Sequence, residues 1–173
     1  MTSDELTPLL IDEATKKSGL VWVNTAAGST PVWLLWHDGS AYVLSGPGEQ
    51  PADGLADGGA VTVTVRSKDK GSRLLTWEAV VSAVAPDGEE WAGVVPLLLG
   101  KRLNLVDGEA AAQRWAGANT VHRLTPTGRL TEAPDTMPDH SLAAAPVPTP
   151  AATEVPMPFT VGGSTRKLPR RRR

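Results

Sequence analysis

The sequence predicts a mainly β fold, a small barrel of about six antiparallel strands that carries peripheral helices. The first observation is an Asp-Gly pair at residues 38–39 between two strand-forming runs. This pair is a strong hairpin signal, because glycine accepts the positive φ of a tight turn. The second is residues 60–66 (AVTVTVR), in which valine alternates with threonine at the period of a half-buried strand.

The hairpin is the best-defined part of this pattern. Its first arm, residues 31–37 (PVWLLWH), is almost continuously apolar, so it cannot present one face to water. We therefore expect this arm to be a central strand that is covered on both faces. A turn at residues 38–40 leads into the second arm, residues 41–45.

Four further strands are predicted from runs of β-branched and aromatic residues between turn signals. In the longest run, Leu75, Trp77, Ala79 and Val81 share one face, which we expect to point into the core. The four predicted strands are residues 20–26, 60–66, 73–85 and 120–125.

Three helices are expected beside the strands. The first, residues 4–17, places leucines at helical spacing and ends on two lysines, which complement the helix dipole. The second, residues 89–99, is closed by Gly100. The third, residues 107–115, begins with Asp107 as its capping residue.

The composition excludes several kinds of functional site. The 173 residues carry a net charge of −2 and contain no cysteine, which excludes disulfides, thiolate metal sites and cysteine nucleophiles. With three histidines we predict no metal site. The acidic start has no positively charged region before an apolar one, and no apolar run reaches about 18 residues, so we expect a cytoplasmic protein without a membrane span.

The chain divides by composition into two parts. We expect residues 1–130 to form the barrel domain, and residues 131–173, which hold eight of the fifteen prolines, to form a disordered tail. The tail ends in RKLPRRRR, with six positive charges in eight residues. Two interpretations stay open for it: contact with a polyanion or another protein, or a solubilising end without a partner.

Two groups of residues are candidates for binding an anion. Ser45, Gly46 and Gly48 can offer a hydroxyl and backbone N–H donors to a phosphate or to the edge of a ring, or they form a loop that needs glycine for its turns. The second group, around the predicted turn at residues 67–72, either grips a phosphate or is a solvated hairpin tip. It consists of Arg66, Lys68, Lys70 and Arg73.

Two of the histidines lie on predicted strands. His37 ends one arm of the hairpin, and His122 is part of the last strand. Either can act as an acid or base near neutral pH, yet neither has a carboxylate or serine partner at a telling spacing. A structural role is the alternative for both, and the catalytic residues stay unassigned.

The order of these elements resembles the split β-barrel of the pyridoxamine 5′-phosphate oxidase-like proteins, which bind FMN or deazaflavin coenzymes. The resemblance covers roughly residues 5–126. It rests on TPVWLLWHDGSAYVLSGPG, on the following AVTVTV, and on HRLTP as the closing strand. It implies a homodimer with the cofactor in a groove between subunits. The cofactor phosphate would be held by the loop that contains Ser45, Gly46 and Gly48.

The chain departs from that family's pattern directly after this loop. Family members that bind a phosphorylated cofactor commonly carry Arg or Lys there, whereas this chain has Glu49-Gln50-Pro51. Two functions are therefore carried forward. The first is an oxidoreductase that uses FMN or the deazaflavin coenzyme, held by Ser45, Gly46, Gly48, Arg66, Lys68 and Arg73. The second is a cofactor-free binding protein that acts through its dimer surface and basic tail.

Overall fold

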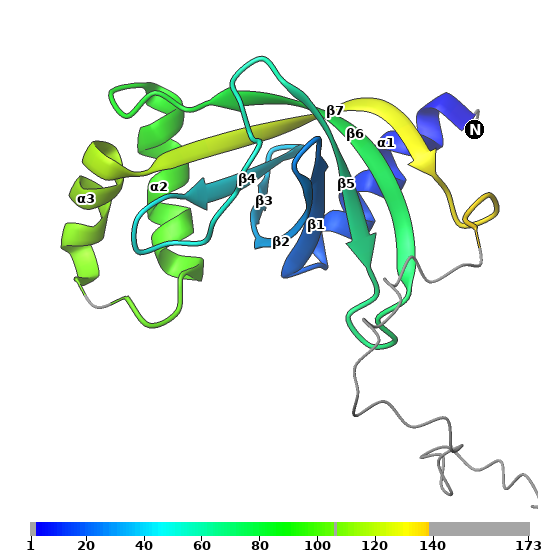
Figure 1. Cartoon of the computed structure of the whole chain (residues 1–173), viewed down its shortest axis with the longest axis horizontal. Coiled ribbons are helices and arrows are strands. Elements are labelled where there is room, and N and C mark those ends of the chain that lie inside the picture. Colours follow the sequence, from blue (N-terminus) through cyan, green and yellow to red (C-terminus); the bar gives the residue numbers. More distant parts are fainter. Residues whose placement is uncertain (1–2, 106, 139–173) are drawn as a thin grey trace, which may run out of the picture. The chain divides into compact units, whose positions relative to one another are not determined.

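A single sheet of seven antiparallel strands, strongly curled, forms the centre of the structure (Figure 1). The computed structural model describes residues 3–138 except residue 106. The basic end and nearly all of the expected tail lie outside these residues. None of the helices in the described part is long and apolar enough to cross a bilayer.

The elements follow one another in nearly the predicted order. The strands are β1 (Leu20–Thr25), β2 (Gly28–Trp33), β3 (Leu35–His37), β4 (Ser40–Ser45), β5 (Ala60–Arg66), β6 (Arg73–Ala83) and β7 (Thr120–Glu132). The helices are α1 (Ser3–Lys16), α2 (Glu89–Lys101) and α3 (Ala111–Ala118), and a 3-10 turn, η1 (Gly108–Ala110), precedes α3.

The predicted strand 31–37 is in fact two strands, and they are not central. The order in the sheet is β2-β1-β5-β6-β7-β4-β3, so β2 and β3 are its two edges. Leu34 alone separates them, which means that the curled sheet brings its edges together at this residue. The apolar sequence is explained by burial on both sides: Val32 and Leu34 join the barrel core, and Leu35 joins the cluster at α2 and α3.

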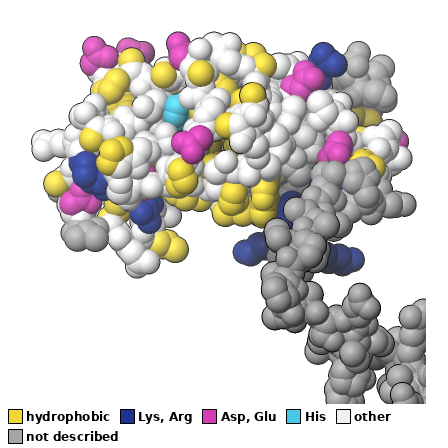
Figure 2. Space-filling view, viewed as in Figure 1, with side chains coloured by type: hydrophobic (Ala, Val, Ile, Leu, Met, Phe, Trp, Pro, Cys, Tyr) yellow, Lys and Arg dark blue, Asp and Glu magenta, His cyan; other side chains and the backbone are white. Residues whose placement is uncertain are grey.

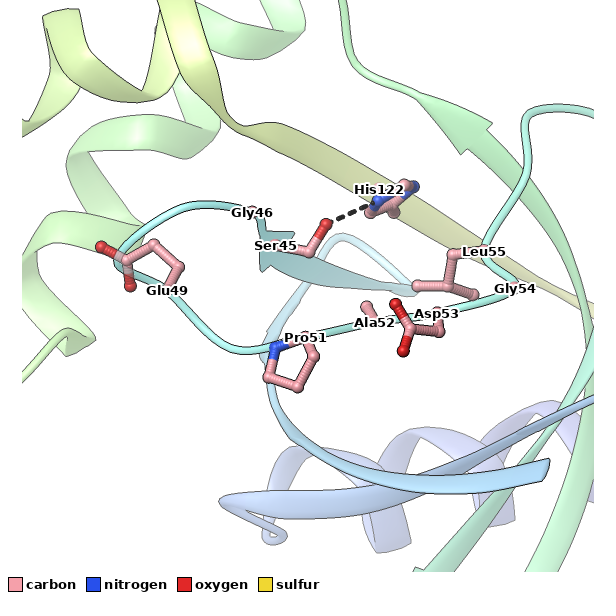
Figure 3. Close-up of a pocket in the computed structure, with 9 residues that line it drawn as sticks. All are labelled: Ser45, Gly46, Glu49, Pro51, Ala52, Asp53, Gly54, Leu55 and His122. Atoms are coloured by element: carbon pink, nitrogen blue, oxygen red, sulfur yellow. Dashed lines mark hydrogen bonds between the residues drawn. The ribbon is translucent and has the colours of Figure 1, made fainter. Parts of the chain in front are cut away.

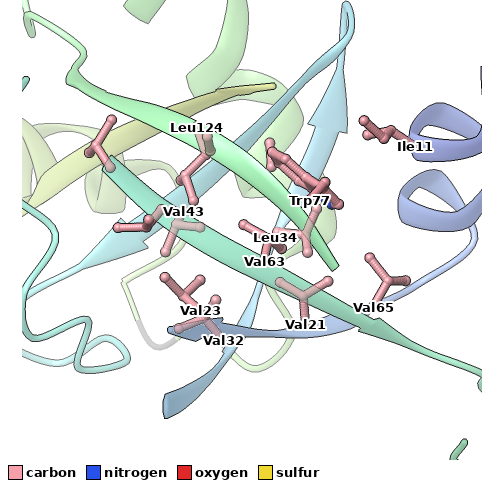
Figure 4. Close-up of a cluster of buried hydrophobic side chains, with 14 of the residues drawn as sticks. Ile11, Val21, Val23, Val32, Leu34, Val43, Val63, Val65, Trp77 and Leu124 are labelled. Carbon is pink, nitrogen blue, oxygen red and sulfur yellow. The ribbon is translucent and has the colours of Figure 1, made fainter. Parts of the chain in front are cut away.

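The fully buried side chains of the barrel interior come from all strands but β3 and from Ile11 of α1, and the partly buried Trp36 of β3 packs against them (Figure 4). The valines of β5, Val61, Val63 and Val65, all point inward, as their alternation predicts. Trp77 is fully buried and meets Trp36 edge to face, with ring centroids 6.0 Å apart. Burial of such large apolar surfaces is the main favourable term in folding.

A second cluster joins the sheet to α2 and α3. The apolar face of α2 consists of Trp91, Val94, Val95 and Leu98, and it packs with Trp115 of α3. Pro96 lies inside α2 without ending it. This cluster holds both helices beside the end of β4, where the candidate site lies.

The turns and element ends show what local sequence could and could not predict. The hairpin turn is confirmed: Asp38 and Gly39 both take positive φ, 46° and 67°. Asp107 makes no side-chain cap, because its carboxylate pairs with Arg114 instead. β7 runs on to Glu132, well beyond the predicted end at residue 125, because it pairs along β6 with register shifts that accommodate Pro126.

Candidate functional site

An open pocket of about 510 Å³ lies at one mouth of the barrel, where β4 ends and β7 begins (Figure 3). The loop between β4 and β5 folds over this mouth, and its Ala52 and Leu55 pack against the barrel core. The pocket is lined by Ser45, Gly46, Glu49, Pro51, Ala52, Asp53, Gly54, Leu55 and His122.

Ser45 and His122 form a hydrogen-bonded pair in this pocket. The register of β4 and β7 pairs Val43 with His122 and Ser45 with Thr120, so Ser45 and His122 lie diagonally on the inward face. The distance from Ser45 Oγ to His122 Nε2 is 2.9 Å. His122 is 7% exposed, and burial lowers its pKa. The imidazole is therefore uncharged near neutral pH. Its Nε2 either donates a hydrogen bond to the serine hydroxyl or accepts one from it, depending on the tautomer.

The backbone of Gly46 is held close to α3. Its φ is +120°, and a Cβ at this position would lie 2.8 Å from Asn119 Nδ2 and 3.2 Å from the Ala118 carbonyl oxygen. Asn119 Nδ2 also donates to the carbonyl oxygens of Ser45 and Pro47, at 3.2 and 3.1 Å. Gly46 is thus required by the turn itself, and the same close packing shapes the pocket rim.

Glu49 fastens the loop to α2 and α3. Its side chain is 1% exposed and accepts hydrogen bonds from Arg102 Nε at 2.7 Å, Trp115 Nε1 at 3.0 Å and Arg114 Nη2 at 3.2 Å. Burial alone would raise the pKa of Glu49, but the hydrogen bonds from Arg102, Trp115 and Arg114 hold it below its ordinary value. Its carboxylate points away from Ser45 and His122 (Figure 3).

The Gln50 side chain connects the end of β2 to β4 by hydrogen bonds. Its Oε1 accepts from the Trp33 backbone N–H at 2.7 Å, and its Nε2 donates to the carbonyl oxygens of Trp33 and Leu44 at 2.9 and 3.0 Å. The side-chain amide therefore acts as a substitute peptide group between β2 and β4. Together Glu49 and Gln50 are structural anchors, which explains why this chain has them where a phosphate-binding Arg or Lys was expected.

The pocket carries negative charge. Asp53 faces Ser45 and His122 across the hollow (Figure 3), and there is no Lys or Arg among the described residues that line it. In the space-filling view, a histidine lies beside an acidic side chain on this face, with no Lys or Arg side chain next to them (Figure 2). Pro51, Ala52 and Leu55 supply an apolar wall.

The second predicted group lies at the opposite end of the strands. Arg66 pairs with Arg73 at the tip of the β5–β6 hairpin, whereas Ala83, at the other end of β6, pairs with His122 beside the pocket. The Arg66 guanidinium lies 4.9 Å from the Trp22 ring and donates to the Gly71 carbonyl oxygen at 2.6 Å.

Arg73 forms an ion pair with Glu132, 2.9 Å apart, and Lys68 is exposed. Gly48, with φ +78°, is also exposed and does not line the pocket. The chain thus brings Ser45 and Gly46 together at the pocket but places Arg66, Lys68 and Arg73 elsewhere. Their role in holding a cofactor stays a prediction.

Sequence reasoning left His122 and Asp53 outside the candidate site. Alternation in residues 120–125 puts His122 on the face of the buried Leu124, and the same alternation puts Ser45 on the face of Val43. Pairing these two segments would have revealed the Ser45–His122 contact. Asp53 stands in an irregular loop, for which no local pattern exists.

Comparison with known proteins addresses the fold. No protein-family model and no curated protein matches the chain at a significant level. The chain is similar to HutZ, the heme storage protein from Vibrio cholerae, with 19% sequence identity and a TM-score of 0.51 over 70% of this chain and 91% of that one.

Two further solved structures are similar to the chain. One is a candidate pyridoxamine 5′-phosphate oxidase from Listeria innocua, with 16% identity and a TM-score of 0.48 over 75% of this chain and 96% of that one. The other is the general stress FMN/FAD binding protein from Xanthomonas citri, with 12% identity and a TM-score of 0.48 over 84% and 96%. The likeness to HutZ shows a shared fold, and the structural neighbours agree in fold with the expected resemblance to pyridoxamine 5′-phosphate oxidase-like proteins.

Proposed function

We propose that this chain binds a flavin-type coenzyme, FMN or the deazaflavin coenzyme, in the pocket at the barrel mouth and serves as an oxidoreductase for a small molecule. The observation that carries the proposal is the position of the pocket. It opens against Ser45 and Gly46, where the family resemblance implies the cofactor, and its volume of about 510 Å³ is in the range of cofactor sites.

The lining residues fit the ring of such a coenzyme. Pro51, Ala52 and Leu55 offer an apolar wall to a ring face, and the Ser45 hydroxyl offers a hydrogen bond to an atom on the ring edge. The lining residues within the described part of the chain do not fit the phosphate, because they include two carboxylates and no Lys or Arg. In a homodimer, which the resemblance implies, a second copy would complete the groove.

When bound, the coenzyme would supply the hydride or electron transfer, and the protein would supply position and electrostatics. His122 fixes the orientation of the Ser45 hydroxyl through their 2.9 Å hydrogen bond. Because burial lowers the pKa of His122, this pair adds no positive charge to the pocket near neutral pH. The apolar wall keeps water from one side of the ring.

The alternative is a cofactor-free interaction protein, and it starts from a different observation. Glu49 forms ion pairs with Arg102 and Arg114, so the charges of these two arginines are paired beside the loop, while Arg114 Nη1 has no hydrogen-bond partner among the described residues. A barrel without a phosphate-binding cation can act as a cofactor-free interaction protein, using its dimer surface and the basic tail. The coenzyme titration described next distinguishes the two functions.

The test is a titration of the purified full chain with FMN and with the deazaflavin coenzyme, followed by coenzyme fluorescence. We expect saturable binding with a Kd near or below about 1 μM. Ser45→Ala should weaken binding about fivefold, the value of one lost hydrogen bond. Ser72→Ala, an exposed serine in the β5–β6 turn, is the matched control and should change nothing.

Failure of both coenzymes to bind a folded chain would contradict the oxidoreductase proposal. The interaction function would then stand, and the dimer surface and the tail would be the places to search.

A further inference from the structure

We infer that the pocket recognises a neutral ring and gives a phosphate no attraction, so its ligand class is an uncharged planar heterocycle with a hydrogen-bond acceptor on one side and a donor on the other. This inference rests on the proposed function and deepens it. It separates two parts of the coenzyme that the family resemblance treats together, the ring and its phosphate.

The first argument is the charge of the pocket wall. Its two carboxylates are Glu49 and Asp53, and none of the nine residues that line it in residues 3–138 is Lys or Arg. Glu49 is neutralised by Arg102 and Arg114, but Asp53 is exposed and makes no ion pair within the described residues. A phosphate placed in this pocket would therefore meet repulsion from Asp53 and no compensating cation.

The nearby arginines, Arg102 and Arg114, do not line the pocket and are paired with carboxylates, and only Arg114 Nη1 lacks a hydrogen-bond partner among the described residues. Arg102 is bound by Glu49 and also donates from Nη1 to the Leu103 carbonyl oxygen at 2.6 Å. Arg114 lies between Glu49 and Asp107, at 3.2 and 2.6 Å. These two cations face two carboxylates, so the cluster is neutral as a whole. Figure 3 shows the Glu49 end of the loop turned away from the hollow.

The second argument is the hydrogen-bonding pattern of the two opposite walls. If His122 Nε2–H donates to Ser45 Oγ, the serine hydroxyl proton is free to donate into the pocket. Asp53, across the hollow, accepts hydrogen bonds only. A ligand that complements these walls has a carbonyl or ring nitrogen on the side that faces Ser45 and an N–H or O–H on the side that faces Asp53.

The experiment compares riboflavin, which has the ring without the phosphate, with FMN on the full-length chain at low and high NaCl. We expect riboflavin to bind at least as tightly as FMN. We also expect added salt to strengthen FMN binding, because salt screens the repulsion from Asp53, and to leave riboflavin binding unchanged.

Asp53→Asn removes the repulsive charge and should shift selectivity towards FMN by about threefold or more. Asp87→Asn, which removes an exposed carboxylate in the turn before α2, changes the net charge equally and should leave selectivity unchanged.

The outcomes are distinguishable. FMN that binds more than about threefold tighter than riboflavin, with affinity that falls as salt rises, overturns the inference and leaves the proposed function standing. Loss of that preference in Arg66→Ala or Lys68→Ala would then assign the phosphate to the basic hairpin of a second copy. Failure of both ligands to bind removes the proposed function and this inference with it.

Discussion

His122 Nε2 lies 2.9 Å from Ser45 Oγ at the mouth of the barrel, and its Nδ1 is buried without a hydrogen-bond partner in the described part of the chain. Within the described residues, the hydrogen bond to Ser45 is therefore the one polar contact that orients the imidazole ring. A buried imidazole that lacks a partner on one nitrogen resists protonation, because the added charge would be poorly solvated. This relationship makes the stability of the site dependent on pH.

We expect the chain to lose stability as the pH falls below about 6.5, the ordinary pKa of histidine. The folded-state pKa of His122 is lowered by burial, so the unfolded chain binds the proton more readily. The contribution is fully present above the unfolded pKa and is lost below it. Urea unfolding at about pH 7.5 and about pH 5.5 measures the difference.

His122→Gln should flatten this pH dependence, and His37→Gln, at an exposed hairpin position, should not. Ser45, which contacts His122, does not titrate in this pH range. Asp53, the ionisable group across the pocket from His122, is the same in both variants. Because the pKa values of Glu49 and Asp107 are lowered, the stability that these two carboxylates contribute is lost at a lower pH than the contribution of His122. Flattening in His37→Gln but not in His122→Gln would refute the assignment.

Glu49→Ala should destabilise the fold by at least about 2 kcal/mol, because it leaves the Arg102 and Arg114 guanidinium groups side by side without their shared carboxylate. Glu78→Ala is the control. Its partner Arg129 is 77% exposed and 3.6 Å away, so its loss should cost less than about 1 kcal/mol. Equal midpoints for the two variants in urea would show that the buried cluster is not a loop anchor.

Gln50→Ala should cost about 2–3 kcal/mol, since it removes three hydrogen bonds that join β2 and β4. Gln50→Glu is nearly isosteric and should be no better at neutral pH, because it sets a carboxylate oxygen against the carbonyls of Trp33 and Leu44. Gln113→Ala, at an exposed site on α3, is the neutral reference. Full stability of Gln50→Glu would rule out the donor role of the amide.

Gly46→Ala and Gly28→Ala separate backbone strain from steric contact. Both glycines have large positive φ, +120° and +130°, so both substitutions carry a conformational cost of about 1–3 kcal/mol. A Cβ at Gly28 meets nothing within 4 Å, whereas a Cβ at Gly46 meets Asn119 and Ala118. Thermal unfolding should therefore rank Gly46→Ala as the less stable protein. The reverse order would contradict the close approach of the loop to α3.

Most of the fold was predictable because local pattern and tertiary burial agree. In β5 the alternation of valine and threonine matches the inward and outward faces of a curled sheet. The break at Leu34 has no local signal, because it depends on the two edges of the sheet meeting there. The apolar run that contains it predicts burial on both faces, which is correct, but not the position of the strand in the sheet.

The candidate site was predictable only in part for the same reason. Ser45 and Gly46 were found through a turn-rich motif that follows a recognisable hairpin. His122 reaches them from a strand 77 residues away, through a pairing between β4 and β7. The side-chain roles of Glu49 and Gln50 depend on α2, α3 and β2, so their neighbours in the sequence carry no sign of them.

The measurement that tests the central proposal most directly is a riboflavin and FMN titration of the isotopically labelled chain, followed by amide chemical shifts in NMR spectra. We expect saturable shifts at Ser45, Gly46, Gly54 and His122 and none at the Arg66–Arg73 hairpin. Shifts confined to that hairpin, or no saturable shifts at the barrel mouth, would contradict the assignment of the pocket as the ligand site.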